Sequence, residues 1–573
     1  MKRILWILNL FIICAANSYA CTNFLVTKGA SAKGATMISY AADSHTLYGE
    51  LYFWPAAKYA AGKMLKIYEW DTGKYLGEIP QAAETYTVNG NMNEHALAIG
   101  ETTYGGREEL VDSTGIIDYG SLIYITLQRA KNAREAIKIM AELVAQHGYC
   151  SSGESFSICD PDEVWILEMI GKGIKADPKT GANLNKGAVW VAVKIPDGYI
   201  SAHANQARIQ NFTWSDGKTS ISSKEMNKIF LPEVETVYSH DVAEIARQYG
   251  FYSGDNKSFS FSDAYNPVDF SGARACEARV WAFFRSVNNE MSKYEDYAMG
   301  RNLKNRMPLY VKPFKQLTLK HTIAMMRDHY EGTPMDMSKD IGAGPYRLPY
   351  RWRPMSWEVD GKKYVHERAI ATQQTGFWFV AECRSHLPRP LAGILWFGVD
   401  DAATSCLTPI YSCSHHVPCE FAAGNGSMLN YSDESAFWIF NRVANFAYLR
   451  YDAISADIQK VQQEIENHHE QEVKAADEYA LWLYEQDPAK ARDFLTELTV
   501  HTASTMFKRW KELDHYLLVK YIDGNIKKEK DTESGKIFER NPYGISKSPN
   551  QPHLPEFWRR IIVNDAGETL KAN

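Results

Sequence analysis

After its first twenty residues the sequence has no run of eighteen or more apolar residues, so no transmembrane helix is expected. It also has no excess of basic charge: 63 Lys and Arg stand against 69 Asp and Glu, a formal net charge of −6. That balance supplies no positive field for nucleic acid, which is therefore not an expected partner. Internal repeats and low-complexity tracts are absent as well. The 45% hydrophobic content of this 573-residue chain supports large cores and excludes wholesale disorder.

The amino terminus has the organisation of a secretory signal peptide. Lys2 and Arg3 precede an apolar stretch, residues 4–16, that is too short to span a bilayer. Small residues follow at Ser18 and Ala20, the third and first positions before the expected cut. We therefore expect a periplasmic or secreted protein. Loss of the two basic residues leaves 61 basic against 69 acidic side chains, or −8.

Cleavage at this position makes Cys21 the first residue, and three interpretations of it compete. Lipidation is disfavoured because Ser18 stands where a lipoprotein signal has Leu or a similar residue. A structural or disulfide-bonded cysteine is the ordinary expectation for an exported chain. In the third interpretation Cys21 is a nucleophile, and its own α-amine, titrating near pH ~8, accepts the thiol proton. Position alone does not choose among the three.

Three polar residues stand at the ends of predicted strands. The strands 21–29 and 35–42 are predicted to form a hairpin that returns Asp43 toward the amino terminus. Asn93 precedes one further predicted strand and Asn205 follows another, and amides in such places are good donors to a developing oxyanion. The alternative interpretation makes Asp43 and Asn93 turn residues and makes Asn205 a partner of nearby backbone.

Several segments resemble the C69 family of dipeptidases. No single motif is decisive, and the similarity rests on their order and number between Cys21 and about Phe421. The matching segments are Cys21-Thr22, the strand ending in Asp43, residues 93–102, 153–156, 163–168, 204–206, 367–375 and 396–403.

The resemblance implies an α+β fold, the four-layer αββα sandwich of the N-terminal nucleophile hydrolases, and hydrolysis of dipeptide substrates. Carried over by position, Cys21 is the nucleophile with its α-amine as base, and Asp43 orients that amine. Asn93 is the oxyanion donor, and Asn205 is a second polar contact near the scissile carbonyl. Two other functions stay open: hydrolysis of another N-acyl amide, and a lipidated surface protein that binds without catalysis.

One position departs from the family pattern. Related enzymes often carry Arg three residues before the aspartate, where this chain has Tyr40. A phenol supplies no permanent charge to lower the thiol pKa. Arg208 is the candidate replacement, and we assign it to substrate binding; otherwise the amine alone tunes the thiol. Arg274, Arg279 and Arg285 are expected to be surface charges.

The other cysteines predict neither a metal nor a cofactor. Nine cysteines become seven once the signal and the candidate nucleophile are set aside, so at least one thiol stays free. Cys150 and Cys159 are predicted to bridge a loop. Cys406, Cys413 and Cys419 do not have the spacing of a zinc site.

The chain is expected to have three parts: a signal peptide (1–20), a catalytic domain (21–430) and a mainly helical extension (431–573). Within the second part, apolar residues at helical spacing predict one helix over 118–146. The extension either covers the core or forms a homo-oligomer contact. Strands are predicted at residues 155–158, 164–170, 189–195, 199–203, 369–375, 377–381 and 394–399.

Overall fold

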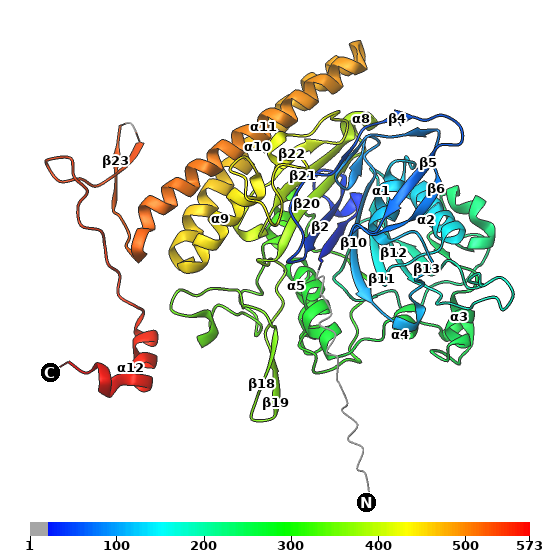
Figure 1. The fold of residues 1–573 in the computed structure, drawn as a ribbon, viewed down its shortest axis with the longest axis horizontal. Helices are drawn as coiled ribbons and strands as arrows, with labels where there is room; N and C mark the ends of the chain where they lie inside the picture. The colour runs from blue at the N-terminus through cyan, green and yellow to red at the C-terminus, as the bar shows by residue number, and fades with distance from the viewer. Residues whose placement is uncertain (1–20, 534, 573) are drawn as a thin grey trace, which may run out of the picture.

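The computed structural model describes residues 21–533 and 535–572 (Figure 1). The predicted signal peptide, residues 1–20, lies outside the described residues. The described chain is a mixed α+β structure with two large sheets and long helices near its carboxyl terminus. Among the helices in these residues, none is long and apolar enough to cross a membrane.

The first sheet has seven strands and contains the predicted amino-terminal hairpin, in which Leu25 lies opposite Ile38. The longest strand, β20, pairs with β2 along its whole length and so places Asp43 opposite Thr375. Residues 369–374, predicted as strand, form a loop instead. In spatial order the strands are β17 (Tyr310–Val311), β14 (Ile200–His203), β1 (Asn23–Val26), β2 (Ala35–Asp43), β20 (Thr375–Arg384), β21 (Gly393–Val399) and β22 (Thr408–Tyr411).

The second sheet has nine strands, antiparallel apart from one parallel pair between β15 and β16. It confirms the strands predicted at 155–158, 164–170 and 189–195. In spatial order the strands are β15 (Ser220–Ser222), β16 (Thr236–Tyr238), β13 (Ala188–Lys194), β12 (Val164–Gly171), β11 (Gly153–Cys159), β10 (Ala98–Gly105), β9 (Met92–Asn93), β8 (Val88–Asn89) and β3 (Phe53–Trp54).

The two sheets pack face to face over a shared hydrophobic core. Side chains alternate along each strand. Leu25 therefore points into the core between the sheets, whereas Phe24 and Val26 belong to a second core on the outer face of the first sheet. A third core covers the outer face of the second sheet, where Phe156 and Trp165 are fully buried.

Helices cover both outer faces (Figure 1). Helices α5 (Ala278–Val287) and α7 (Leu319–Met326) contribute to the core on the first sheet. Helices α1 (Tyr119–Leu127) and α2 (Ala133–His147) contribute to the core on the second. The single helix predicted over 118–146 is thus wrong. A second helix starts after Asn132. The Asn132 side chain accepts a hydrogen bond from the Glu135 backbone N–H and so caps this new helix.

Smaller elements complete this part of the chain. The β5–β6 hairpin, β5 (Met64–Tyr68) with β6 (Tyr75–Pro80), lies beside the site described below. The others are β4 (Ala57–Lys58), β7 (Glu84–Thr85), α3 (Val242–Gln248), α4 (Phe261–Tyr265), α6 (Glu295–Ala298), β18 (Ser356–Val359), β19 (Lys362–Val365) and α8 (Arg389–Ala392).

Three long helices follow the last strand of the first sheet, as the sequence predicts. They are α9 (Ala436–Leu449), α10 (Tyr451–Gln486) and α11 (Pro488–Tyr521), and their apolar faces join the same core as β20 and β21. The chain then leaves the core through β23 (Glu529–Thr532), β24 (Gly535–Phe538) and α12 (Glu556–Leu570), the last of which buries no residue (Figure 1).

Candidate functional site

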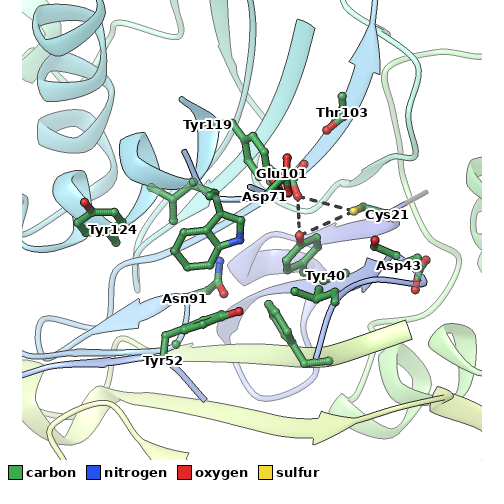
Figure 2. A pocket seen from close by; sticks show the side chains of 18 of the residues that line it. Cys21, Tyr40, Asp43, Tyr52, Asp71, Asn91, Glu101, Thr103, Tyr119 and Tyr124 are labelled. Carbon is green, nitrogen blue, oxygen red and sulfur yellow. Dashed lines mark hydrogen bonds between the residues drawn. The ribbon is translucent and has the colours of Figure 1, made fainter. Parts of the chain in front are cut away.

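A cavity of about 190 Å³ lies between the two large sheets, beside β2 of the first and β10 of the second (Figure 2). Cys21 lines it together with Tyr40 and Asp43 of β2 and Glu101 of β10. The cavity is much larger than the ~10–15 Å³ that one water molecule needs, so it has room for a small ligand. The amino-terminal hairpin therefore brings Asp43 to Cys21, as the sequence predicts.

The Cys21 thiol is almost fully buried, with 5% exposure, and faces oxygen atoms. Its Sγ lies 3.6 Å from Glu101 Oε1 and 3.7 Å from the Tyr40 hydroxyl, which donates a 2.5 Å hydrogen bond to that same carboxyl oxygen (Figure 2). Burial raises the pKa of the thiol well above its usual value, and the Glu101 and Asp43 charges raise it further. The thiol is therefore protonated at neutral pH, so its attack on a carbonyl requires a base.

Tyr40 occupies the position where the family pattern expects Arg, and packing holds its ring in place. Phe377 and Phe379 of the neighbouring strand meet it edge-on. Gly100 on the facing sheet leaves room, because a Cβ there would lie 3.3 Å from the Tyr40 Cβ and 2.7 Å from the Asn23 amide. Tyr40 thus supplies a hydroxyl, and the positive charges near Cys21 come from elsewhere in the chain.

Arg279 is one of those charges, and its predicted surface position is wrong. It is 1% exposed and donates to the Cys21 carbonyl oxygen at 2.6 Å and to the Thr22 hydroxyl at 2.8 Å. It also donates to the Asn205 side-chain oxygen at 2.9 Å. The sequence does carry a signal for this burial: Arg279 interrupts an apolar helical segment, residues 278–284, that could not face solvent.

Arg368 is the second charge, and it pairs with Asp43. Its guanidinium lies 2.5 Å from one Asp43 oxygen, and the Thr375 hydroxyl donates to the other at 2.6 Å. Burial raises the pKa of Asp43, and the Arg368 charge opposes that rise. The ion pair compensates the negative charge of Asp43 beside the Cys21 thiol. The sequence analysis did not assign this function to Arg368.

Arg208, predicted to bind substrate, is committed elsewhere. It is 2% exposed and forms an ion pair with Glu277 at 2.8 Å. Its remaining N–H groups donate to the carbonyl oxygens of Ala202, Pro308 and Leu309. This guanidinium holds loops together and does not line the cavity.

Asn205 is joined to the site through Arg279. Its backbone is in the left-handed region, at φ 57°, and its amide donates to the Thr103 carbonyl at 2.6 Å. Since Arg279 bridges Asn205 to the Cys21 carbonyl, both residues belong to one network around the start of β1.

Asn93 does not reach Cys21, which corrects its expected position. Both amide hydrogens are used, on the Leu127 and Ala130 carbonyls at 2.7 Å each, and its oxygen accepts from the backbone of His95 and Leu97. Asn91, two residues earlier, lines the cavity with Cys21 and spends one N–H on the Ile99 carbonyl. Asn91 lies in the turn between β8 and β9, whereas Asn93 lies within β9, and only Asn91 of the two lines the cavity.

Glu101 has a second carboxyl group beside it. Glu154 on the adjacent strand β11 is fully buried and accepts from the Thr103 hydroxyl at 2.7 Å. Burial raises the pKa of Glu101 to about 7 and that of Glu154 well above its usual range. The two carboxyl groups also hydrogen-bond to each other, which lowers the pKa of Glu101 and raises that of Glu154. We conclude that this pair retains a proton at neutral pH.

Aromatic side chains form the opposite wall of the cavity, and the sequence analysis did not identify them (Figure 2). Trp54 stacks on Tyr124 with ring centres 4.9 Å apart, and Tyr52 meets Trp70 edge-on at 4.7 Å. The β5–β6 hairpin carries Trp70, whose backbone N–H donates to Asp118 at 2.8 Å and ties the hairpin to the start of α1.

Cys159 and Cys383 face each other across the two sheets, with their sulfur atoms 3.7 Å apart. Both are fully buried, and the eight cysteines of the described residues are all free thiols. The predicted partner of Cys159 was Cys150, which is not its neighbour here. The short spacing between Cys150 and Cys159 suggested that bridge. It could not reveal that Cys383, on a strand of the other sheet, lies beside Cys159.

A buried thiol beside a carboxyl group and an adjoining ligand-sized cavity are features that a cysteine-type enzyme requires. Comparison with protein families agrees. The model of Peptidase family C69 matches residues 20–464, and the chain belongs to that family of cysteine-type peptidases. This confirms the resemblance found in the sequence.

Curated relatives are similar over most of their length. A probable dipeptidase of Salmonella dublin is 22% identical over 427 residues, which cover 69% of this chain and 82% of the relative. One from Latilactobacillus sakei is 23% identical and covers 77% and 83%. Probable dipeptidase B of Streptococcus pyogenes serotype M1 is 19% identical and covers 87% and 93%.

Proposed function

We propose that this protein is an exported dipeptidase in which Cys21, made the first residue by signal cleavage, attacks the scissile carbonyl. The observation that carries the proposal is the position of the Cys21 thiol: it lines a ligand-sized cavity while Arg279 holds the carbonyl of the same residue. The dipeptidase names of the curated relatives support the substrate class. Two facing sheets with helices on both outer faces support assignment to the N-terminal nucleophile hydrolase sandwich.

The proposed reaction has two stages. The free α-amine takes the thiol proton, which the raised thiol pKa makes necessary, and the sulfur adds to the carbonyl carbon. Asn91 and a backbone N–H hold the oxyanion, the ammonium returns its proton to the leaving amine, and the C–N bond breaks. Water, activated by the same amine, then hydrolyses the thioester. Asp43, held by Arg368 and Thr375, orients the α-amine, and Asn205 positions the first residue through Arg279.

The test compares a chain that begins at Cys21 with one that carries a single extra residue before it. Both are assayed on a panel of free dipeptides and on N-acyl amino acids. We expect dipeptide cleavage by the first chain alone, and none by its Cys21→Ala variant. Cys419→Ala is the matched control, because that thiol is exposed.

Equal cleavage by both chains would contradict the role of the α-amine while leaving the peptidase assignment intact. Cleavage of N-acyl amino acids but not dipeptides would replace the proposal with an amidase. A chain isolated with residues 1–20 still attached, in the organism that makes it, would contradict export by a cleaved signal.

A further inference from the structure

The charged groups of the Cys21 cavity are unequally balanced. Its lining contains three acidic residues, Asp43, Asp71 and Glu101, and no Lys, Arg or His among the residues described. Asp43 is neutralised by Arg368. In the described part of the chain neither Asp71 nor Glu101 enters an ion pair, so two carboxyl groups face the cavity without a compensating cation.

These two carboxyl groups are close enough to interact. The charge of Asp71 raises the pKa of Glu101, and Figure 2 places both side chains on the same side of the cavity. The Tyr119 hydroxyl donates to Asp71 at 2.9 Å. This hydrogen bond fixes the Asp71 carboxyl group at the mouth of the cavity. Glu101, at 2% exposure, lies deeper, beside the Cys21 thiol, and shares a hydrogen bond with Glu154. A ligand with several N–H donors and a positive charge would satisfy both groups.

The position of Glu101 identifies which part of a substrate it meets. A carbonyl carbon about to be attacked lies roughly 3–3.5 Å from the nucleophile. In a dipeptide the α-ammonium is two bonds from that carbon. Glu101 Oε1 is 3.6 Å from Cys21 Sγ. The α-ammonium of a bound dipeptide therefore falls within reach of this carboxyl group, whereas substrate groups farther from the scissile carbonyl do not.

The aromatic wall then lies where the first side chain of the dipeptide must go. Tyr52, Trp54, Trp70 and Tyr124 line the cavity, each only partly covered by the protein. Rings of this kind bind large apolar side chains and attract a nearby ammonium through their faces.

We propose that this cavity is the subsite for the amino-terminal residue of the substrate: Glu101 and Asp71 bind the free α-ammonium, and the wall of Tyr52, Trp54, Trp70 and Tyr124 packs on a large apolar side chain. The inference rests on the proposed dipeptidase function and gives it a direction. The enzyme selects dipeptides with an unblocked amino terminus and an aromatic or large aliphatic first residue.

Binding is measured first, by calorimetry on the Cys21→Ala variant, so that hydrolysis does not interfere. The probes are Phe-Gly, Gly-Gly and N-acetyl-Phe-Gly. We expect Phe-Gly to bind on the order of 10²-fold more tightly than its acetylated form, because acetylation removes a charge that meets the buried Glu101 and the more exposed Asp71. Gly-Gly is expected to bind about 10-fold more weakly than Phe-Gly.

Variants on the Cys21→Ala background then separate the two parts of the subsite. Glu101→Gln and Asp71→Asn are expected to weaken Phe-Gly binding, by roughly 10²-fold and 10-fold, and to leave N-acetyl-Phe-Gly unchanged. Trp70→Ala is expected to remove the preference for Phe-Gly over Gly-Gly. The matched controls are Glu109→Gln and Trp482→Ala, which are exposed and far from the cavity lining.

Equal binding of Phe-Gly and N-acetyl-Phe-Gly would overturn the inference, as would unchanged selectivity in Asp71→Asn and Trp70→Ala. Those two side chains lie at the mouth of the cavity, so the test does not depend on the folding of Glu101→Gln. Hydrolysis by the chain that begins at Cys21 is scored separately. Selective binding without any hydrolysis would contradict the proposed function alone.

Discussion

Asn91 and Asn93 are only two residues apart, but their amides have different surroundings. Asn93 is fully buried, and four hydrogen bonds to backbone groups use its side chain completely. Asn91 lines the cavity and donates one described side-chain hydrogen bond, to the Ile99 carbonyl. Removing a buried amide leaves its former partners unsatisfied, whereas removing an oxyanion donor affects only the transition state.

We therefore predict that Asn93→Ala loses about 2–4 kcal/mol of unfolding free energy with little change in kcat. Asn91→Ala is expected to lower the Tm less than Asn93→Ala, because it gives up one described hydrogen bond and not four, and to lose on the order of 10²–10³ in kcat. Thermal unfolding and steady-state kinetics on the same preparations check both. An Asn93→Ala protein with normal Tm and greatly reduced kcat would restore Asn93 as the oxyanion donor.

Glu101 makes stability depend on pH. Its pKa is about 7 in the folded protein, against an ordinary value of 4.5, so the unfolded chain gives up this proton at lower pH. Unfolding therefore becomes more favourable as pH rises from 4.5 to 7, and the loss is complete above 7. Glutamine has no proton to lose and avoids this cost.

The prediction is that Glu101→Gln gains stability relative to the wild type between pH 5 and pH 8, by about 2–3 kcal/mol. Denaturant unfolding across that pH range measures it, with the exposed Glu109→Gln as control. A stability difference that shrinks or stays constant with rising pH would show that Glu101 ionises normally in the fold.

The β5–β6 hairpin closes one side of the cavity because the second residue of α1, at the point of contact, is a glycine. The Trp70 ring rests on Gly120, where a Cβ would lie 2.5 Å from a ring carbon. The hairpin is tied there by Trp70 to Asp118 and by Tyr119 to Asp71. At residue 120, helix propensity therefore favours alanine, whereas the packing of Trp70 requires glycine.

Alanine normally stabilises a helix over glycine by roughly 0.5–1 kcal/mol. We predict that Gly120→Ala lowers the Tm instead, and that it changes the tryptophan fluorescence as Trp70 is displaced. In a Trp70→Gly background, which removes both the ring and the Cβ that would lie 2.7 Å away, the same substitution should recover the usual stabilising effect. A double-mutant cycle by thermal unfolding measures this coupling, and additive effects would refute the contact.

The carboxyl-terminal helices belong to the same core as the sheets, whereas the final segment does not. Apolar residues of α9, α10 and α11 share a core with β20 and β21. Helix α12 buries none of its side chains. The two regions therefore respond differently to truncation, because only the first covers apolar surface.

A chain that ends at Asn550 is predicted to keep its Tm and its kcat/KM unchanged. A chain that ends at Asn430 is predicted to be insoluble or unfolded, since it exposes the faces that α9–α11 cover. Expression, thermal unfolding and peptidase assays compare the two. A soluble, active chain ending at Asn430 would make the helical region dispensable.

The free thiols of Cys159 and Cys383 come from facing strands of the two sheets and meet in the core. In an oxidising compartment exported cysteines usually pair. With sulfur atoms already 3.7 Å apart, these two are the expected partners. We predict a Cys159–Cys383 peptide in the non-reduced digest of protein isolated from its native compartment. Alkylation of both thiols without prior reduction would contradict it.

The sequence by itself determined the features that depend on neighbouring residues. Strand alternation and the short loop place Asp43 at the end of the β1–β2 hairpin next to Cys21, and a composition rich in Ala, Glu and Gln predicts the long helices after residue 430. Local patterns suffice here because each contact joins residues close in the chain. The order of the motifs was also enough to identify the family.

The tertiary structure alone decided which charges and amides surround the thiol. Arg279 lies 258 positions after Cys21, and Arg368 lies 325 positions after Asp43. Residue type does not distinguish them from Arg208, whose guanidinium is spent on Glu277. Asn91 and Asn93 are likewise separated by the fold, because Asn91 lies in the β8–β9 turn and Asn93 within β9. Such choices depend on which distant strand or helix packs against the site, and that information is not contained in any local pattern.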